Sequence, residues 1–176
     1  MATTELTGAE EVAWDLGDLY DGPDDPRIES DIAEAEVDAA AFRVRYHGKV
    51  AELDAQALAE AVAEHERIES GVVRPLTFAH LLFATNMADP TRGALVARLG
   101  EKAAALETQL LFFPLEWAAV PDDAADAVLA DGALDQWRHH LLSARKFRPY
   151  LLTEPEEKVV TEKTVSGVAA WSRLYE

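Results

Sequence analysis

The apolar residues of this chain recur at the three- and four-residue spacing of amphipathic helices. After Pro26 the spacings alternate between four and three, at Ile28, Ile32, Ala35, Ala39, Phe42 and Tyr46. This pattern places all six side chains on one face of a helix. Asp25 can cap its start, Pro26 fits the first helical position, and Gly48 after His47 suits its C-terminal cap.

The same periodicity predicts a second helix after Asp54. Its inner face holds Leu58, Ala61, Val62, His65, Ile68 and Val72. Gly71 and Pro75 are expected to break or bend this helix, because proline lacks an N–H and its ring clashes with the preceding turn. The next segment, 76–87, is the most apolar stretch of the chain. We therefore expect it to be the most buried.

Capping residues indicate where the next helices begin and end. Asp89-Pro90 begins a helix with apolar positions Leu95, Leu99, Ala103, Leu106, Leu110 and Phe113. Pro114 and Pro121 bracket a piece around Trp117 that we expect to be irregular. Asp122 begins a short acidic helix that ends at Gly132.

Three more helices are predicted toward the C-terminal side. The first is marked by Leu134, Trp137, Leu141 and Ala144, and Arg148-Pro149 ends it. The second begins at a capping box of Thr153 and Glu156 and runs to about Lys163. Ser166 begins the last helix, which extends through Trp171, Leu174 and Tyr175.

These elements predict an all-α fold, an antiparallel bundle of about six to eight helices. Abundant alanine favours helix over sheet, and no strand-like alternation competes with the helical pattern. We divide the chain into a flexible lead at 1–13, an antiparallel helical hairpin region at 14–115 and a second helical segment at 116–176.

Composition removes several classes of chemistry. The 176 residues include no cysteine, which excludes disulfides, thiolate metal sites and cysteine nucleophiles. The 33 acidic and 16 basic side chains give a net charge of −17, so we expect no binding to nucleic acid. No segment has the length and hydropathy of a membrane span, and the acidic N-terminus does not resemble a secretory signal. A cytoplasmic location is therefore expected, without membrane association.

One short string resembles a metal motif. His65-Glu66-Arg67-Ile68-Glu69 is similar to His-Glu-x-x-His with glutamate in place of the second histidine. His65 and Glu69 lie one helical turn apart and could both bind zinc, with Glu66 as a base. A helix rich in Glu and Arg also produces such strings by chance, and His65 lies on the apolar face. The structural interpretation is the stronger one.

The remaining polar clusters also have two interpretations. His139-His140, with Arg138, Arg145, Lys146 and Arg148, could bind a carboxylate, or could be cations that favour the helix C-terminus. His80 is expected to be a hydrogen-bonded core residue, and His47 has no evident partner. The run Asp122, Asp123 and Asp126 is expected to be a solvated helix N-terminus rather than a calcium site.

Motifs near both ends resemble one family. They are Trp14-Asp15-Leu16-x-Asp18-Leu19-Tyr20, Asn86-Met87-Ala88-Asp89-Pro90, Phe112-Phe113-x-Leu115-Glu116, Trp137-Arg138-His139-His140-Leu141, Arg145-Lys146-x-Arg148-Pro149-Tyr150-x-Leu152, Glu156-Glu157-Lys158 and Gly167-x-x-Ala170-Trp171-Ser172-Arg173-Leu174-Tyr175. In this order they resemble oligoendopeptidase F, among the thimet-oligopeptidase-like zinc metallopeptidases. Tyr150 stands where the family commonly has histidine.

The resemblance implies the N-terminal, non-catalytic helical domain of an enzyme that hydrolyses short peptides. Family members are several times longer, and a His-Glu-x-x-His helix and a later glutamate in their C-terminal half hold the zinc. No catalytic, cofactor or metal residue is therefore assigned here, and the chain alone should be inactive. Its helices would form part of a channel wall that restricts substrate size, and its negative charge would favour basic or neutral peptides.

The partners implied are the catalytic domain, in the same or a companion chain, and short peptides. Without that domain the piece should expose an apolar face near Trp171 and Tyr175 and self-associate. The alternative is a stand-alone helical interaction module without catalysis. A third hypothesis, a metal enzyme built on His65 and Glu69, is weakened because no Glu-x-x-His pair occurs.

Overall fold

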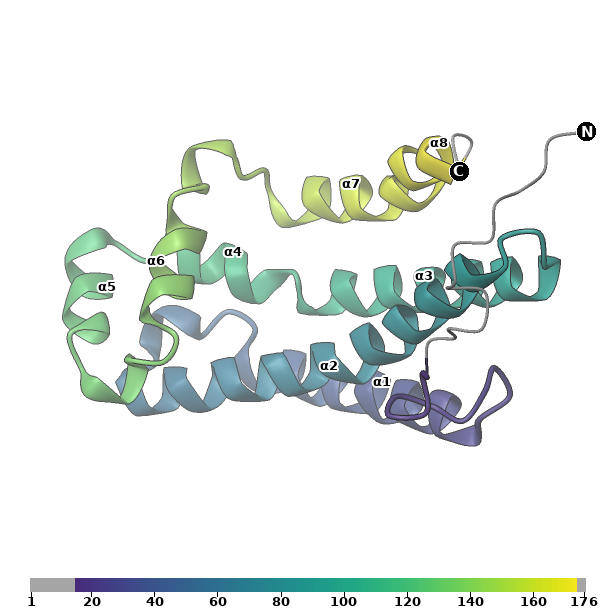
Figure 1. Ribbon diagram of the computed structural model, residues 1–176. Coiled ribbons are helices and arrows are strands. Elements are labelled where there is room, and N and C mark those ends of the chain that lie inside the picture. The colour runs from purple at the N-terminus through teal and green to yellow at the C-terminus, as the bar shows by residue number, and fades with distance from the viewer. Residues whose placement is uncertain (1–14, 174–176) are drawn as a thin grey trace, which may run out of the picture.

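A computed structural model describes residues 15–173 of the chain. These residues form eight α-helices and three short 3-10 helices, with no β-strand among them. Three long helices, α1 (Pro26–Tyr46), α2 (Ala55–Thr85) and α3 (Pro90–Leu110), alternate in direction and make up the body of the bundle (Figure 1). The predicted all-α class is confirmed.

The short helices cover one end and one side of this body (Figure 1). After α3 come α4 (Phe112–Ala119), α5 (Asp122–Leu129) and α6 (Arg138–Arg145), which gather at the end of the bundle where α2 begins. The chain then returns along α3 through α7 (Glu154–Ser166) to α8 (Val168–Arg173). The 3-10 helices η1 (Val50–Glu52), η2 (Gly132–Leu134) and η3 (Arg148–Tyr150) connect these elements.

The helix ends follow the capping residues of the sequence. The carboxylates of Asp25, Asp54 and Asp89 accept hydrogen bonds from backbone N–H groups in the first turns of α1, α2 and α3. Gly48 has φ +78°, which supports its predicted role at the end of α1. The capping box of Thr153 and Glu156 is present at the start of α7.

The break expected at Pro75 and the irregular piece expected around Trp117 are both absent from the described residues. The helix does not break at Pro75, so α2 runs for 31 residues and includes the predicted separate segment. The missing N–H of Pro75 would have bonded to the carbonyl of Gly71, and the packing of Val72, Phe78 and Ala79 compensates for that lost bond. The piece around Trp117 is helix α4, because Pro114 lies in its first turn, where no intrahelical N–H bond is required.

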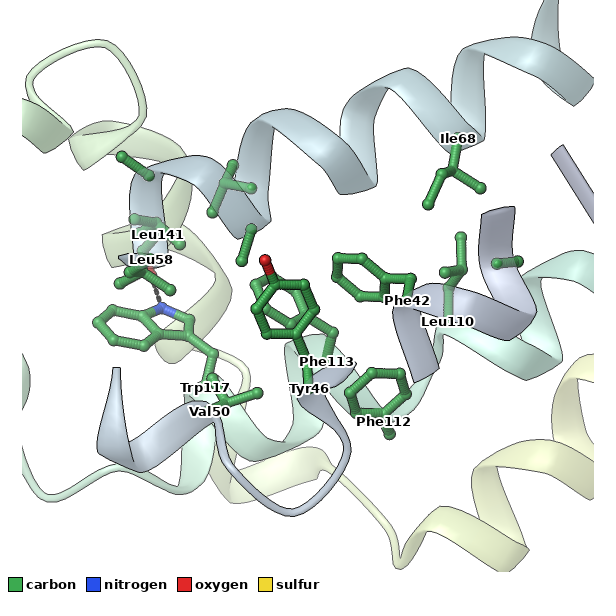
Figure 2. Close-up of a cluster of buried hydrophobic side chains, with 14 of the residues drawn as sticks. Phe42, Tyr46, Val50, Leu58, Ile68, Leu110, Phe112, Phe113, Trp117 and Leu141 are labelled. Carbon is green, nitrogen blue, oxygen red and sulfur yellow. Dashed lines mark hydrogen bonds between the residues drawn. The ribbon is translucent and has the colours of Figure 1, made fainter. Parts of the chain in front are cut away.

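Two apolar clusters form the core. The larger joins α1 and α2 to α4, α5, η2 and α6, and Phe42 lies among the aromatic rings of Tyr46, Phe112 and Phe113 (Figure 2). The smaller lies at the other end, where Tyr20, Ile28, Phe78 and Leu99 meet. All six apolar residues predicted for the first helix are buried.

The segment 76–87 is less buried than expected. Only Phe78 and Ala79 are fully buried within it, and Met87 is exposed. The C-terminal part of α2 packs against α1, α3 and residues 16–20 on one face, while Thr77, His80, Ala84 and Thr85 are exposed. None of the helices in the described part combines the length and the hydropathy of a membrane span.

Candidate functional site

A pocket of about 240 Å³ opens where α2, α4 and α6 meet. We call it the His65 pocket; the lining side chains that matter below are His65, Glu66, Glu69, Phe113, Trp117 and His140. It brings together residues of both polar clusters that the sequence singled out. Because residues 65 and 140 are far apart in the sequence, no local sequence pattern could predict that they lie together.

The inner wall of the pocket is aromatic because α4 presents a run of large rings to the core. Phe113 and Trp117 are buried on α4, and the indole Nε1 of Trp117 donates to the carbonyl of Leu141 at 3.0 Å (Figure 2). The His65 ring stacks on Phe113, with centroids 5.3 Å apart. It also meets the Phe42 ring edge-on. His65 is therefore largely a packed aromatic residue, as its place on the apolar face predicted.

The polar atoms of the pocket are mostly hydrogen-bond acceptors. His65 Nδ1 lies 3.4 Å from Glu69 Oε2, while Nε2 is buried without a hydrogen-bond partner among the described residues. Glu66 Oε2 accepts a hydrogen bond from Trp137 Nε1 at 2.9 Å. Burial and the nearby negative charge of Glu69 raise the pKa of Glu107 on α3 above its ordinary value. The electrostatic environment is thus negative.

The pocket does not fit a zinc site. His65 and Glu69 supply two ligands at most, and Glu66 is bonded to an indole. Within residues 15–173 no three His, Asp or Glu side chains are placed to hold a metal ion. Structural and catalytic zinc sites need at least three protein ligands, so no zinc chemistry is assigned to these residues.

The basic residues near His139-His140 bind the protein itself. Arg145 donates to the carbonyls of Trp117 and Val120 at 2.8 and 2.7 Å, and also to Asp122 at 2.6 Å. Arg148 shares Asp122, at 2.7 Å. These arginines therefore join α6 and η3 to the end of α4 and the start of α5. The geometry therefore does not favour the interpretation of these residues as a free basic patch that binds a carboxylate.

Asp122 shows how the acidic run is used. The guanidinium groups of Arg148 and Arg145 lower the pKa of its carboxyl below the ordinary value. Asp123 and Asp126 are exposed, as expected for a solvated helix N-terminus. The pairing of Asp122 was not predicted, because its partners lie more than 20 residues further along the chain.

The other two histidines differ from expectation. His80 is exposed, so the prediction of a core histidine is wrong. It lies on a face of α2 that is exposed within residues 15–173. His47 has a partner that the sequence did not reveal: its Nε2 lies 3.2 Å from Glu154 Oε2, and Arg43 binds the other oxygen of Glu154 at 2.7 Å.

The N-terminal motif contributes packing rather than chemistry. Tyr20 is buried against Phe78, and its hydroxyl donates to Asp31 at 2.6 Å. Burial and the bond to Asp31 raise the pKa of Tyr20. Arg74 donates to the carbonyls of Asp18 and Leu19, which fixes the motif on α2. Trp14 lies outside the described residues.

The C-terminal motif residues are mostly exposed. The exposed fraction is 79% for Tyr150 and 66% for Trp171, and Phe147, Leu152, Val159, Val160 and Val168 are also exposed. None of the α7 residues whose burial the structure describes is fully buried. Leu174 and Tyr175 lie outside the described residues.

Comparison with known proteins gives one match. Residues 116–176 match the family model described as oligopeptidase F, which covers the N-terminal region of these peptidases. No curated protein and no solved structure gives a significant match. The matched segment begins inside α4 and includes α5, α6, α7 and α8. The family resemblance inferred from the sequence is thereby confirmed for this segment, which is similar to the N-terminal region of oligopeptidase F.

Proposed function

We propose that this chain is the N-terminal, non-catalytic helical region of a zinc-dependent oligoendopeptidase that hydrolyses short peptides. The family match at 116–176 carries the proposal. In it, the helices form part of the wall of a channel that admits short peptides and excludes folded proteins. The zinc ligands and the catalytic base lie outside residues 1–176, and a cytoplasmic location remains a prediction.

The distribution of exposed apolar residues supports this role. Val160, Val168 and Trp171 on α7 and α8 are at least half exposed, whereas α1 and α2 bury the inward apolar positions that their sequences predict. An exposed apolar surface of this kind is typical of a contact with another domain. We propose the catalytic domain as the partner of this surface.

The division of the chain into regions 14–115 and 116–176 also remains a proposal, and its boundary falls inside α4.

The test is a reconstitution. The purified chain, supplied with zinc, should not hydrolyse a fluorogenic short peptide. Combined with an oligopeptidase F catalytic region that carries His-Glu-x-x-His, it should support cleavage of that peptide but not of the same sequence held in a folded protein. Chelator-sensitive cleavage by the chain alone would contradict the non-catalytic assignment. Equal cleavage of both substrates would contradict the channel role.

The alternative, a stand-alone interaction module, rests on the same exposed apolar residues. Sequencing the reading frame beyond Glu176 separates the two proposals. Continuation to a His-Glu-x-x-His motif supports the peptidase region. A stop codon after Glu176, without a companion chain that carries the motif, favours the interaction module.

A further inference from the structure

The His65 pocket offers acceptors and negative charge to a ligand. Its rim carries the carboxylates of Glu66 and Glu69, and none of the described lysines or arginines lines it. A ligand that brings N–H donors and positive charge would complement these groups.

The aromatic wall favours the same kind of ligand. Phe113 and Trp117 line the pocket beneath the carboxylates. The face of an aromatic ring attracts ammonium and guanidinium groups, and an apolar wall accommodates an alkyl stem. Within this protein the Trp117 ring already has one cationic neighbour, because the Arg145 guanidinium lies 5.4 Å from its centroid.

The carboxylates are positioned before any ligand arrives. Trp137 holds Glu66 through its indole N–H, and the helical turn of α2 that carries Glu66 and Glu69 is packed on the core through Val62 and Ile68. Glu107 adds a neighbouring carboxylate, whose pKa is raised by burial and, to a smaller extent, by repulsion from Glu69. A bound cation would relieve this repulsion. His65 and His140 are the basic side chains that line the pocket among the described residues.

From this arrangement we infer that the His65 pocket binds the cationic side chain of an arginine or lysine in a peptide. At about 240 Å³ the pocket is smaller than typical sites for drug-sized ligands, and it suits a single side chain. The choice of a peptide as the source of the cation rests on the proposed function. The pocket itself belongs to this chain, and its binding is measured without any catalytic domain.

The experiment uses the 176-residue chain and two tripeptides. One is N-acetyl-Ala-Arg-Ala-amide, and the other carries citrulline, a neutral isostere, in place of arginine. The indole N–H signal of Trp137 in a nitrogen–proton correlation spectrum reports on the pocket, because that group is bonded to Glu66. We expect a saturable shift with the arginine peptide and none with the citrulline peptide.

Variants locate the binding. Glu69→Gln should raise the Kd about threefold to fivefold, the effect of one partly exposed charge pair. Glu60→Gln removes the same charge from an exposed position of the same helix, and should leave the Kd unchanged. Ala144→Leu should abolish the shift, because Ala144 lines the pocket and the added methyl groups would occupy it. Thermal melts confirm that each variant is folded.

Three outcomes would overturn the proposal. They are the absence of a saturable shift, equal binding of the arginine and citrulline peptides, and equal weakening by Glu69→Gln and Glu60→Gln, which would indicate general attraction to a chain of charge −17. None of them affects the reconstitution test above. Failure of the pocket and failure of the peptidase role are therefore distinguishable.

Discussion

Arg145 illustrates how single residues hold the end of this bundle together. Its side chain is 8% exposed, and the guanidinium binds two backbone carbonyls at the C-terminal end of α4 and the carboxylate of Asp122. The last carbonyls of a helix lack the regular intrahelical partner, and here the carbonyl of Trp117 accepts from Arg145 in addition to the N–H of Val120. Arg145 therefore completes α4 from a helix that begins 19 residues after α4 ends.

Replacing this guanidinium should be costly. Arg145→Met keeps much of the stem but removes the charged donor from the carbonyls of Trp117 and Val120, which keep only the longer bonds from Val120 N–H at 3.2 Å and Arg148 at 3.3 Å. We expect the free energy of unfolding to fall by about 1.5–3 kcal/mol, the range for hydrogen bonds made by a charged group. Urea denaturation measures the change. Arg67→Met, at a half-exposed position that is paired only with surface carboxylates, should cost less than about 1 kcal/mol. Similar losses for the two variants would refute the carbonyl-satisfying role.

The residue scale is also where sequence reasoning was least successful. Local spacing can show that His65 lies on an apolar face, but it cannot show that Glu154 reaches His47 across 107 residues. His80 lies in an apolar stretch, and such a stretch is a poor guide when one face of the helix has no neighbour. The His65 pocket could not be predicted either, because three separate helices supply its walls.

At the scale of elements, the contact of α1 with α2 depends on Gly71. A Cβ added there would lie 2.9 Å from the Cβ of Ala35 and 3.3 Å from the carbonyl oxygen of Asp31. The two helices approach so closely that only a hydrogen fits between them. This is the physical reason for a glycine inside a long helix, which otherwise costs about 1 kcal/mol relative to alanine.

Two glycine substitutions test this contact. Gly71→Ala should destabilise the protein by about 1–2 kcal/mol, because overpacking outweighs the gain in helix propensity. Gly100→Ala in α3 meets nothing within 4 Å, and should stabilise it by about 0.5–1 kcal/mol. Chemical denaturation of both variants gives the comparison. A stabilising Gly71→Ala would show that α1 and α2 can separate without cost.

The helices themselves were predictable, because caps and spacing act within a few residues. Asp25, Asp54, Asp89 and the capping box of α7 mark four helix starts correctly. The errors concern Pro75 and Pro114. Tertiary packing around Pro75 and the first-turn position of Pro114 override the tendency of proline to end a helix. Local spacing and capping residues thus predict the all-α fold class, whereas the continuity of α2 through Pro75 depends on packing against other helices.

The attachment of α7 rests on Glu154, which binds Arg43 and His47 of the α1 end. The Arg43 guanidinium is the main reason that the pKa of Glu154 lies below its ordinary value, with a smaller contribution from His47. Because the folded pKa is lowered, the stabilisation is complete above the ordinary value of 4.5 and is lost as the pH falls through the folded pKa.

Glu154→Gln should therefore loosen α7. At pH 7 we expect a loss of about 0.5–1 kcal/mol, since the pair is partly exposed, and faster amide hydrogen exchange across 154–166. The difference in unfolding free energy from the unmodified chain should narrow below pH 4.5. Glu162→Gln, on the same helix with its nearest basic partner at 4.0 Å, is the control. Unchanged exchange in α7 would indicate that contacts with α3 hold the helix.

At the scale of the whole molecule, charge and apolar exposure act in opposite directions. A net charge of −17 opposes association of identical chains, and salt screens that repulsion. The exposed apolar side chains of α7 and α8 favour association. Which effect prevails depends on ionic strength, so the predicted self-association of the isolated chain should depend on salt concentration.

We expect the chain to be monomeric at low salt and to self-associate reversibly at 0.1–1 mM protein in about 0.3 M NaCl, where the Debye length is well below 10 Å. Light scattering at both salt concentrations measures the mass. Trp171→Ser removes the largest exposed apolar group of α8 and should weaken the association, whereas Met87→Ser, an exposed apolar residue at the end of α2, should not. A monomer at 1 mM in high salt, or equal effects of the two variants, would show that α7 and α8 present no surface that needs a partner. The exposed apolar residues would then no longer support a contact with a catalytic domain, and the proposed function would rest on the family match at 116–176 alone.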